Sequence, residues 1–275
     1  MLEKEQLPHI LNLVDDDAEE VRNYVFKDLT DYGLALEEDL FEFAEVIDRK
    51  NLDIIDPIIK NNRRKWLRRN WHQWFDVRNY YEKIEIAMNL ISKFQLGYFQ
   101  QISLSERLDQ ISEDFKNRYP YGNELDLANY LFQVLDLRGD KRDYYSPLNS
   151  NLYYTLEEGK GLPLTLTLIF ILIGERLGFD VVGCNFPGHF MAKINIDDEL
   201  LLIDCFNGGR IIFESEIKTL TNDSYESVMK IIHTKSDAET IIKRVLKNLI
   251  NAYREKEDTP NLHVISELLT STKWK

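Results

Sequence analysis

The spacing of apolar residues predicts helices through most of the first half of the chain. Residues 7–33 carry two apolar stripes of helical period, separated by Asp15-Asp16-Asp17, which breaks the first stripe and offers a cap for the second. The same period returns, with polar breaks, in the segments 36–59, 80–118 and 124–137. Residues 240–254 and 261–270 predict two further helices near the end of the chain.

The pattern changes between residues 159 and 210. Leu164 to Leu177 is almost entirely apolar, follows Pro163 and stops at Gly178, which predicts a buried helix with a well-defined start and end. Shorter apolar runs separated by turn signals come next and predict three antiparallel strands: Val181 to Asn185, His189 to Ile196 and Glu199 to Phe206. Helices, a helix packed on a small antiparallel meander, and more helices make the predicted fold class α+β.

Composition indicates the class of protein. The chain has 275 residues, 44% of them hydrophobic, which is enough for a sizeable core. The longest apolar run, Leu162 to Ile173, is shorter than the ~20 residues of a membrane span, so it predicts a buried helix. Two cysteines exclude a disulfide framework. With no export signal visible, we expect a soluble cytoplasmic protein without membrane contact.

Charge is concentrated at the start of the chain. Residues 1–59 hold 17 acids and 5 bases, a net −12, which leaves −1 of the total of −13 for the remainder. A run of six bases without an acid follows and is interleaved with tryptophans: Lys60, Arg63, Arg64, Lys65, Arg68 and Arg69. Basic and aromatic residues together are typical of single-stranded nucleic-acid sites. The alternative, which we favour in an acidic chain, is a helix whose Leu67, Trp71 and Trp74 face the core.

Three regions follow from these patterns. Residues 1–78 predict a helical N-terminal region, in which residues 7–33 resemble one HEAT-type repeat with Val21-Arg22 at its usual place. Because about three repeats are needed for a solenoid, we expect a subdomain rather than an extended array. Residues 79–225 predict the α+β core, and residues 226–275 the C-terminal helices.

The second hairpin brings two functional side chains together. If Asp197-Asp198 is a two-residue loop, Ile196 pairs with Glu199 and Met191 with Asp204. Strand side chains alternate between faces, so His189 and Asp204 lie on one face as diagonal neighbours. A His beside an Asp provides two of the three parts of a nucleophile, base and orienting-acid site. The start of the 164–177 helix is the natural place for the third, because the helix dipole lowers the pKa of a thiol there.

Four motifs surround this arrangement: Asn149-Ser150, Gly161-Leu162-Pro163-Leu164-Thr165-Leu166, Phe186-Pro187-Gly188-His189-Phe190, and Asp204 followed by Gly208-Gly209. Together they resemble the SirB-type branch of the transglutaminase-like superfamily, over roughly residues 70–225, and are similar to a domain of certain F-box proteins. The resemblance implies a papain-like or transglutaminase-like core and a Cys-His-Asp triad. His189 matches the His of that triad and Asp204 matches the Asp.

The Cys position of the triad falls at or beside Thr165, so the nucleophile departs from the superfamily pattern. The resemblance places Ser or Thr there commonly in the SirB-type branch, whose members mostly lack an assigned activity. A hydroxyl is not ionised near neutral pH, and an internal Thr lacks the N-terminal amine that activates Thr nucleophiles. Thr165 is then a helix-start residue bonded to backbone. Cys184 shares the predicted face of His189 and is an off-pattern alternative, whereas Cys205 points to the other face.

These observations leave two functional hypotheses of different class. The first, which we favour, is a non-catalytic interaction or regulatory module that binds a protein partner. The second is a hydrolase or acyl-transferase that acts on amide or isopeptide bonds through Thr165, His189 and Asp204. No cofactor signature is present, and the acidic clusters lack the D-x-D-x-D-G pattern of a calcium loop, so we expect neither cofactor nor metal.

Overall fold

The computed structural model describes residues 2–43, 47–97, 102–221 and 224–271. The chain divides into two units, one made of residues 1–71 and 93–101, the other of residues 72–92 and 102–275. Each unit is described by itself. Within the described residues, none of the helices has the length and apolar character that a membrane crossing requires.

The first unit is helical because its apolar residues recur at helical spacing and its polar residues provide the breaks. Its elements are η1 (Lys4–Gln6), α1 (Leu7–Leu11), α2 (Glu19–Tyr32), η2 (Gly33–Ala35), α3 (Leu36–Glu42) and α4 (Arg49–Asn70). The buried core joins α1, α2, α3 and α4: Leu7, Leu11, Val14, Val25, Leu29, Leu36, Leu40 and Ile55. The paired helices predicted over residues 7–33 are therefore confirmed as α1 and α2.

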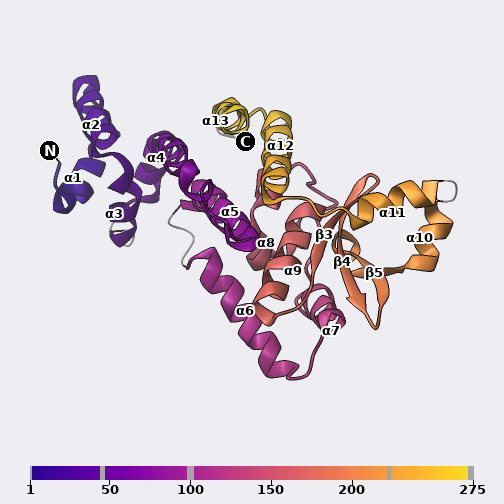
Figure 1. Cartoon of the computed structure of the whole chain (residues 1–275). Helices are drawn as coiled ribbons and strands as arrows, with labels where there is room; N and C mark the ends of the chain where they lie inside the picture. Colours follow the sequence, from indigo (N-terminus) through magenta and orange to yellow (C-terminus); the bar gives the residue numbers. More distant parts are fainter. Residues whose placement is uncertain (1, 44–46, 98–101, 222–223, 272–275) are drawn as a thin grey trace. The chain divides into compact units, whose positions relative to one another are not determined.

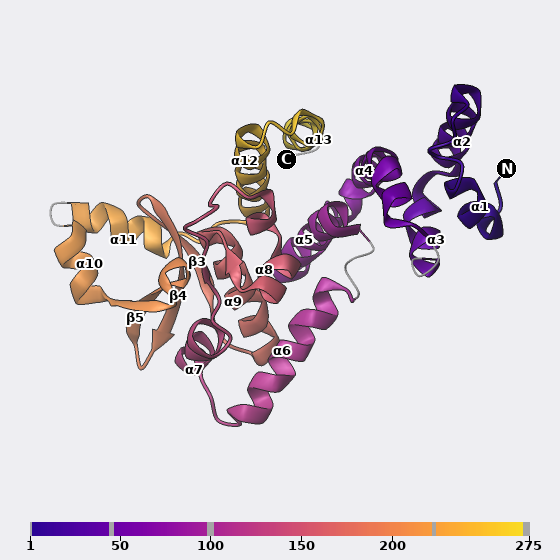
Figure 2. The same ribbon diagram turned by 180° about the vertical axis from the view of Figure 1, so that it is seen from behind.

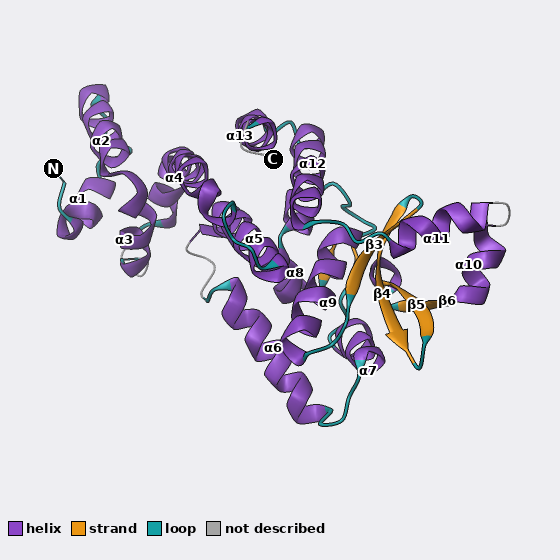
Figure 3. Ribbon diagram, in the orientation of Figure 1, coloured by secondary structure: helices purple, strands orange, loops and turns teal. Residues whose placement is uncertain are grey.

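The second unit surrounds a small sheet with helices (Figure 3). The helices before the sheet are α5 (Tyr80–Leu96), whose residues 93–96 belong to the first unit, α6 (Leu104–Arg118), α7 (Glu124–Asn129), α8 (Leu152–Glu158) and α9 (Pro163–Leu177). Those after it are α10 (Glu214–Thr221), α11 (Tyr225–His233), α12 (Ala238–Glu255) and α13 (Thr259–Thr270). Short 3-10 turns η3 (Trp71–Trp74), η6 (Pro147–Ser150) and η7 (Cys205–Asn207) and the π-turn η5 (Tyr130–Val134) link them. The fold class is α+β, as the sequence predicts.

The sheet is an antiparallel meander in the order β3-β4-β5-β6, formed by β3 (Val182–Phe186), β4 (His189–Ile196), β5 (Glu199–Asp204) and β6 (Arg210–Phe213). Helix α9 lies on one side of it and α10 and α11 on the other, in both views (Figures 1 and 2). Cys184, Met191 and Leu202 pack with residues of α10 and α11. Because side chains alternate along a strand, Phe190, Ala192 and Ile194 face α9.

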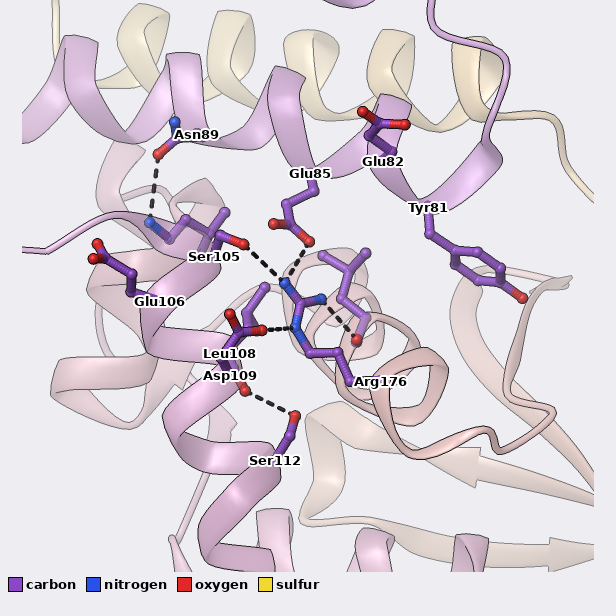
Figure 4. Close-up of polar contacts among 12 residues, drawn as sticks. Tyr81, Glu82, Glu85, Asn89, Ser105, Glu106, Leu108, Asp109, Ser112 and Arg176 are labelled. Atoms are coloured by element: carbon purple, nitrogen blue, oxygen red, sulfur yellow. Dashed lines mark hydrogen bonds and ion pairs between the residues drawn. The ribbon is translucent and has the colours of Figure 1, made fainter.

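Helix α9 begins and ends where its sequence requires. Pro163 occupies its first position, and Gly178 ends it in the left-handed conformation, with φ 77°. Near its C-terminal end, Arg176 contacts Glu85 of α5 at 2.8 Å and Asp109 of α6 at 2.6 Å (Figure 4). The same guanidinium donates to the Ser105 hydroxyl at 3.2 Å. This one side chain therefore fixes α9 to the two helices that cover it.

The boundaries of two predicted elements were wrong, and three short strands were not predicted. The third predicted strand ends at Asp204 rather than Phe206, because the Asp204 carboxylate accepts the backbone N–H of Asn207 and closes the turn η7. A fourth strand, β6, follows that turn. The helix predicted over residues 124–137 is α-helical only to Asn129 and continues as the π-turn η5. The short parallel pair β1 (Arg138–Gly139) and β2 (Lys160–Gly161) has no counterpart in the predicted pattern.

Candidate functional site

His189 is positioned by the turn between β3 and β4. Pro187-Gly188 forms a two-residue loop, so Phe186 pairs with His189 at the first rung of the ladder. Gly188 adopts φ 75°, a left-handed conformation that a residue with a side chain rarely takes. The loop therefore places His189 at the open end of the sheet, where its side chain is 20% exposed.

Asp204 is positioned by the turn between β4 and β5. Asp197 and Asp198 both have positive φ, 51° and 68°, as a two-residue hairpin turn requires. Ile196 pairs with Glu199 across it, which confirms the predicted loop length. With that register, the alternation of side chains puts Asp204, the last residue of β5, on the same face as His189.

The two side chains form a hydrogen-bonded pair. His189 Nε2 lies 2.7 Å from Asp204 Oδ1. The carboxylate also accepts the backbone N–H of Asn207 at 3.1 Å and the Asn207 side-chain amide at 2.8 Å. An ionised carboxylate only accepts, so Nε2 carries the proton that it donates to Asp204. Nδ1 is left as the ring nitrogen to which the described residues make no hydrogen bond.

The charge state of Asp204 follows from these contacts. Burial alone would raise the pKa of this carboxyl, because a charged group loses hydration inside the protein. The hydrogen bonds from His189 and Asn207 outweigh that effect and hold the pKa of Asp204 below its usual value. The group is therefore an anion at neutral pH, and it fixes both the orientation and the tautomer of His189.

Thr165 lies in the first turn of α9, but its hydroxyl is directed elsewhere. Its Oγ1 donates to the backbone carbonyl of Asn149 at 2.8 Å, and the residue is 2% exposed. Among the described residues, no hydrogen bond joins Thr165 to His189. Helix α9 packs on the face of the sheet that carries Phe190. By the alternation of side chains, His189 shares the opposite face with Met191. The structure therefore brings His189 and Asp204 together and leaves Thr165 in a backbone contact.

Neither cysteine is placed as a nucleophile. Cys184 is fully buried, and burial raises the pKa of its thiol to about 11. Cys205 is also fully buried, in η7, and burial raises its pKa to about 12. Reactive cysteines carry lowered pKa values and are accessible. Both thiols therefore act as small hydrophobic groups in the core.

Aromatic rings continue outward from His189 and were missed by the sequence reasoning. The His189 ring is 6.1 Å from that of Phe206, Phe206 is 6.1 Å from Tyr144, and Tyr144 is 5.3 Å from Tyr145. We call these four residues the aromatic row. Lys141 Nζ lies 6.0 Å from the centre of the Phe206 ring. The adjacent tyrosines in a loop of polar residues were the only sequence signal for it.

The fold and these motifs agree with a comparison to known families. The model of the transglutaminase-like superfamily matches residues 102–247, more than half of the chain. The chain belongs to this superfamily. The matched segment begins near the start of α6 and extends into α12, so this transglutaminase-like domain contains the whole sheet and α9.

Relatives of the domain occur in proteins of different size. The chain is 35% identical over 130 residues to the UPF0162 protein of Xylella fastidiosa (strain Temecula1 / ATCC 700964). The matched segment covers 45% of this chain and 46% of that protein. It is 28% identical to the UPF0162 protein of Vibrio cholerae over 46% of this chain and 48% of the other. The chain is 26% identical to F-box only protein 21 of Mus musculus, over 46% of this chain and 21% of that protein. Each match spans less than half of the relative. No solved structure matches the chain.

The basic run lies on α4 and continues toward buried aromatics. Leu67, Trp71 and Trp74 are at most 2% exposed, as expected for a helix whose apolar face is in the core. Lys60 pairs with Asp56 at 2.7 Å, and Arg63 pairs with Glu37. Basic side chains that are already neutralised by carboxylates contribute less to phosphate binding.

Among the described residues, no group of three or more His, Cys, Asp or Glu side chains is arranged to hold a metal ion. In the acidic cluster before α2, Asp15 pairs with Lys50 at 2.7 Å, and Asp16 accepts the backbone N–H of Ala18 at 2.8 Å. The predicted cap was wrong: Ala18 is the N-cap residue of α2, and no side chain caps that helix.

Proposed function

We propose that this transglutaminase-like protein of the SirB-type branch is non-catalytic and acts as a protein-interaction or regulatory module. One observation carries the proposal: the Thr165 hydroxyl donates to the Asn149 carbonyl instead of to His189. General-base activation requires the nucleophile to be within hydrogen-bond reach of the base. The matches to UPF0162 proteins support the assignment to the branch.

The chemistry of the side chains supports the same proposal. A Thr hydroxyl needs a base to remove its proton, and here that proton is held by a backbone carbonyl in a buried position. The two thiols have raised pKa values, so the thiolate fraction near neutral pH is small for both. The His189–Asp204 pair in this proposal is a structural contact that orders the end of the sheet.

The interaction role is supported by the organisation of the chain. We propose a HEAT-like helical region over residues 1–78, a transglutaminase-like core over 79–225 and helices over 226–275. The relative named F-box only protein 21 combines a similar segment with a much longer chain, as expected for a module. The two free cysteines support action in a reducing compartment, which we propose is the cytoplasm.

Turnover measurements test the proposal directly. The full chain is incubated with fluorogenic amide and isopeptide substrates, beside the variants His189→Ala and Thr165→Val. The matched control is Thr167→Val, a second buried Thr of α9 whose hydroxyl contacts the Phe190 carbonyl at 3.5 Å. We expect no release above buffer for any of them. Release by the unmodified chain that both His189→Ala and Thr165→Val abolish, but Thr167→Val does not, would overturn the proposal.

A second candidate function is the hydrolase or acyl-transferase. It is favoured by the 2.7 Å contact between His189 and Asp204, by the partly exposed imidazole and by the lowered pKa of Asp204, which are the orienting half of a catalytic triad. In this case the Thr165 hydroxyl must leave the Asn149 carbonyl and come within hydrogen-bond reach of His189. The substrate panel above distinguishes the two candidates.

A further inference from the structure

The aromatic row is exposed at the end opposite His189. Tyr144 is 44% exposed and Tyr145 is 49% exposed, although large aromatic side chains are usually covered in a folded protein. Their rings meet edge to face at 82°, and Tyr144 meets Phe206 at 70°. Edge-to-face contacts stabilise such ring pairs, and Tyr is enriched at protein interfaces.

The loop that carries the tyrosines is held in place. The Asn149 side-chain amide donates to the carbonyls of Asp143 at 2.7 Å and Tyr144 at 3.4 Å. Asp140 Oδ1 accepts the backbone N–H groups of Arg142 and Asp143. A surface that is ordered before binding loses less conformational entropy when a partner docks.

Two bases, Lys141 and Arg142, precede the tyrosines in this loop. Lys141 bonds to the Asn207 side-chain oxygen at 3.0 Å, and no described carboxylate lies within ion-pair distance of Lys141 or Arg142. Asp143 pairs with Lys256 at 2.8 Å, and Asp140 accepts backbone amides while keeping its negative charge. Lys141 and Arg142 therefore offer two positive charges, without a carboxylate partner among the described residues, next to the tyrosines.

From these observations we propose that the aromatic row, together with Lys141 and Arg142, docks an extended acidic peptide segment of a partner protein. Aromatic and apolar side chains of the segment pack on Tyr144, Tyr145 and Phe206, while its carboxylates face the two bases. This names the partner class for the interaction role and rests on that proposed function. Nucleic acid also combines negative charge with stacking, but its affinity comes largely from contacts to many phosphates, and only two bases are available here.

Fluorescence anisotropy of the full chain tests this inference. The probe is a fluorescein-labelled peptide in which Phe and Tyr alternate with Glu. Its comparisons are the same peptide with Lys in place of every Glu, and a labelled oligothymidylate. We expect saturable binding of the acidic peptide, weakening as salt is added, and at least tenfold weaker binding of the other two probes.

Two variants and two matched controls assign the surface. The double substitutions Tyr144→Ala/Tyr145→Ala and Lys141→Glu/Arg142→Glu should each weaken binding about tenfold or more. Tyr121→Ala removes a tyrosine that is fully exposed outside the row, and Lys247→Glu reverses an exposed base of α12. Both controls should change affinity by less than about twofold. Circular dichroism of all four confirms that each variant is folded.

Several results would overturn the inference. They are the absence of acidic-peptide binding, equal binding by the tyrosine variant, or tighter binding of the oligothymidylate. The last result would assign the surface to nucleic acid instead. These outcomes are separate from turnover: peptide binding can fail while the chain shows no hydrolysis, and hydrolysis that both His189→Ala and Thr165→Val abolish overturns the non-catalytic function whatever the peptide does.

Discussion

Replacing Asp204 by Ala removes the acceptor on which the end of the sheet depends. The carboxylate accepts three hydrogen bonds, one from His189 and two from Asn207, and its side chain is 9% exposed. The substitution leaves the His189 Nε2–H and the Asn207 backbone N–H without their partner. The turn η7 and the start of β6 are then expected to loosen.

The expected loss in the free energy of unfolding follows from these contacts. A hydrogen bond to a charged group contributes about 1.5–3 kcal/mol to stability. The full value does not apply to all three, because Asn207 is exposed and its freed donors regain water, and because removing a buried charge relieves a desolvation cost. We therefore expect Asp204→Ala to lower the free energy of unfolding by about 2–3 kcal/mol. Asp204→Asn, which keeps one acceptor oxygen, should cost about 1 kcal/mol.

Urea unfolding followed by circular dichroism measures the loss in the free energy of unfolding, and its dependence on pH provides a second test. The pKa of Asp204 is lowered in the folded protein, so its contribution is complete above the unfolded pKa of about 3.9 and is lost as pH falls through the lower folded value. The stability difference between the unmodified chain and Asp204→Asn should be constant near neutrality and shrink below about pH 4.

Two results would refute this reasoning. A loss below about 0.5 kcal/mol for Asp204→Ala would mean that the three contacts do not order the turn. A stability difference that is independent of pH down to acid unfolding would mean that the carboxylate has an ordinary pKa. The double variant His189→Ala/Asp204→Ala gives the coupling within the pair, which we expect to be about 1–2 kcal/mol.

Three further predictions concern the same domain. Gly209→Ala should lower the free energy of unfolding by about 2–4 kcal/mol, because φ is 73° and the added Cβ would lie 2.6 Å from the Phe132 ring. Gly188→Ala, with φ 75° and open space around the added Cβ, should lower it by only about 1 kcal/mol, and equal losses in urea titrations would contradict this. Cys184 and Cys205 should resist iodoacetamide at pH 7.5 in the folded protein and react in urea, because burial raises both pKa values; rapid modification of the native chain, read by mass spectrometry, would disprove it. Arg176→Met should cost about 2 kcal/mol, mainly by breaking the ion pair with Glu85, in which both side chains are mostly shielded from water; the pair with the exposed Asp109 contributes less. An unchanged thermal midpoint would count against that role.

The sequence by itself determined the features that depend on neighbouring residues. Pro163 and Gly178 bound the buried helix, because proline fits the first turn and glycine accepts the left-handed end. The turns Pro187-Gly188 and Asp197-Asp198 set the loop lengths, and loop length sets which side chains share a face. The His189–Asp204 juxtaposition could therefore be predicted without a structure.

Tertiary structure decided what depends on residues distant in the chain. The Thr165 hydroxyl donates to the carbonyl of Asn149, 16 positions earlier, a pairing that only the packed fold decides. The aromatic row joins Tyr144 to Phe206 across a stretch that contains α8, α9 and most of the sheet. Propensity and periodicity act over a few residues and leave such pairings open, because the contacts form only when the packed core brings the segments together.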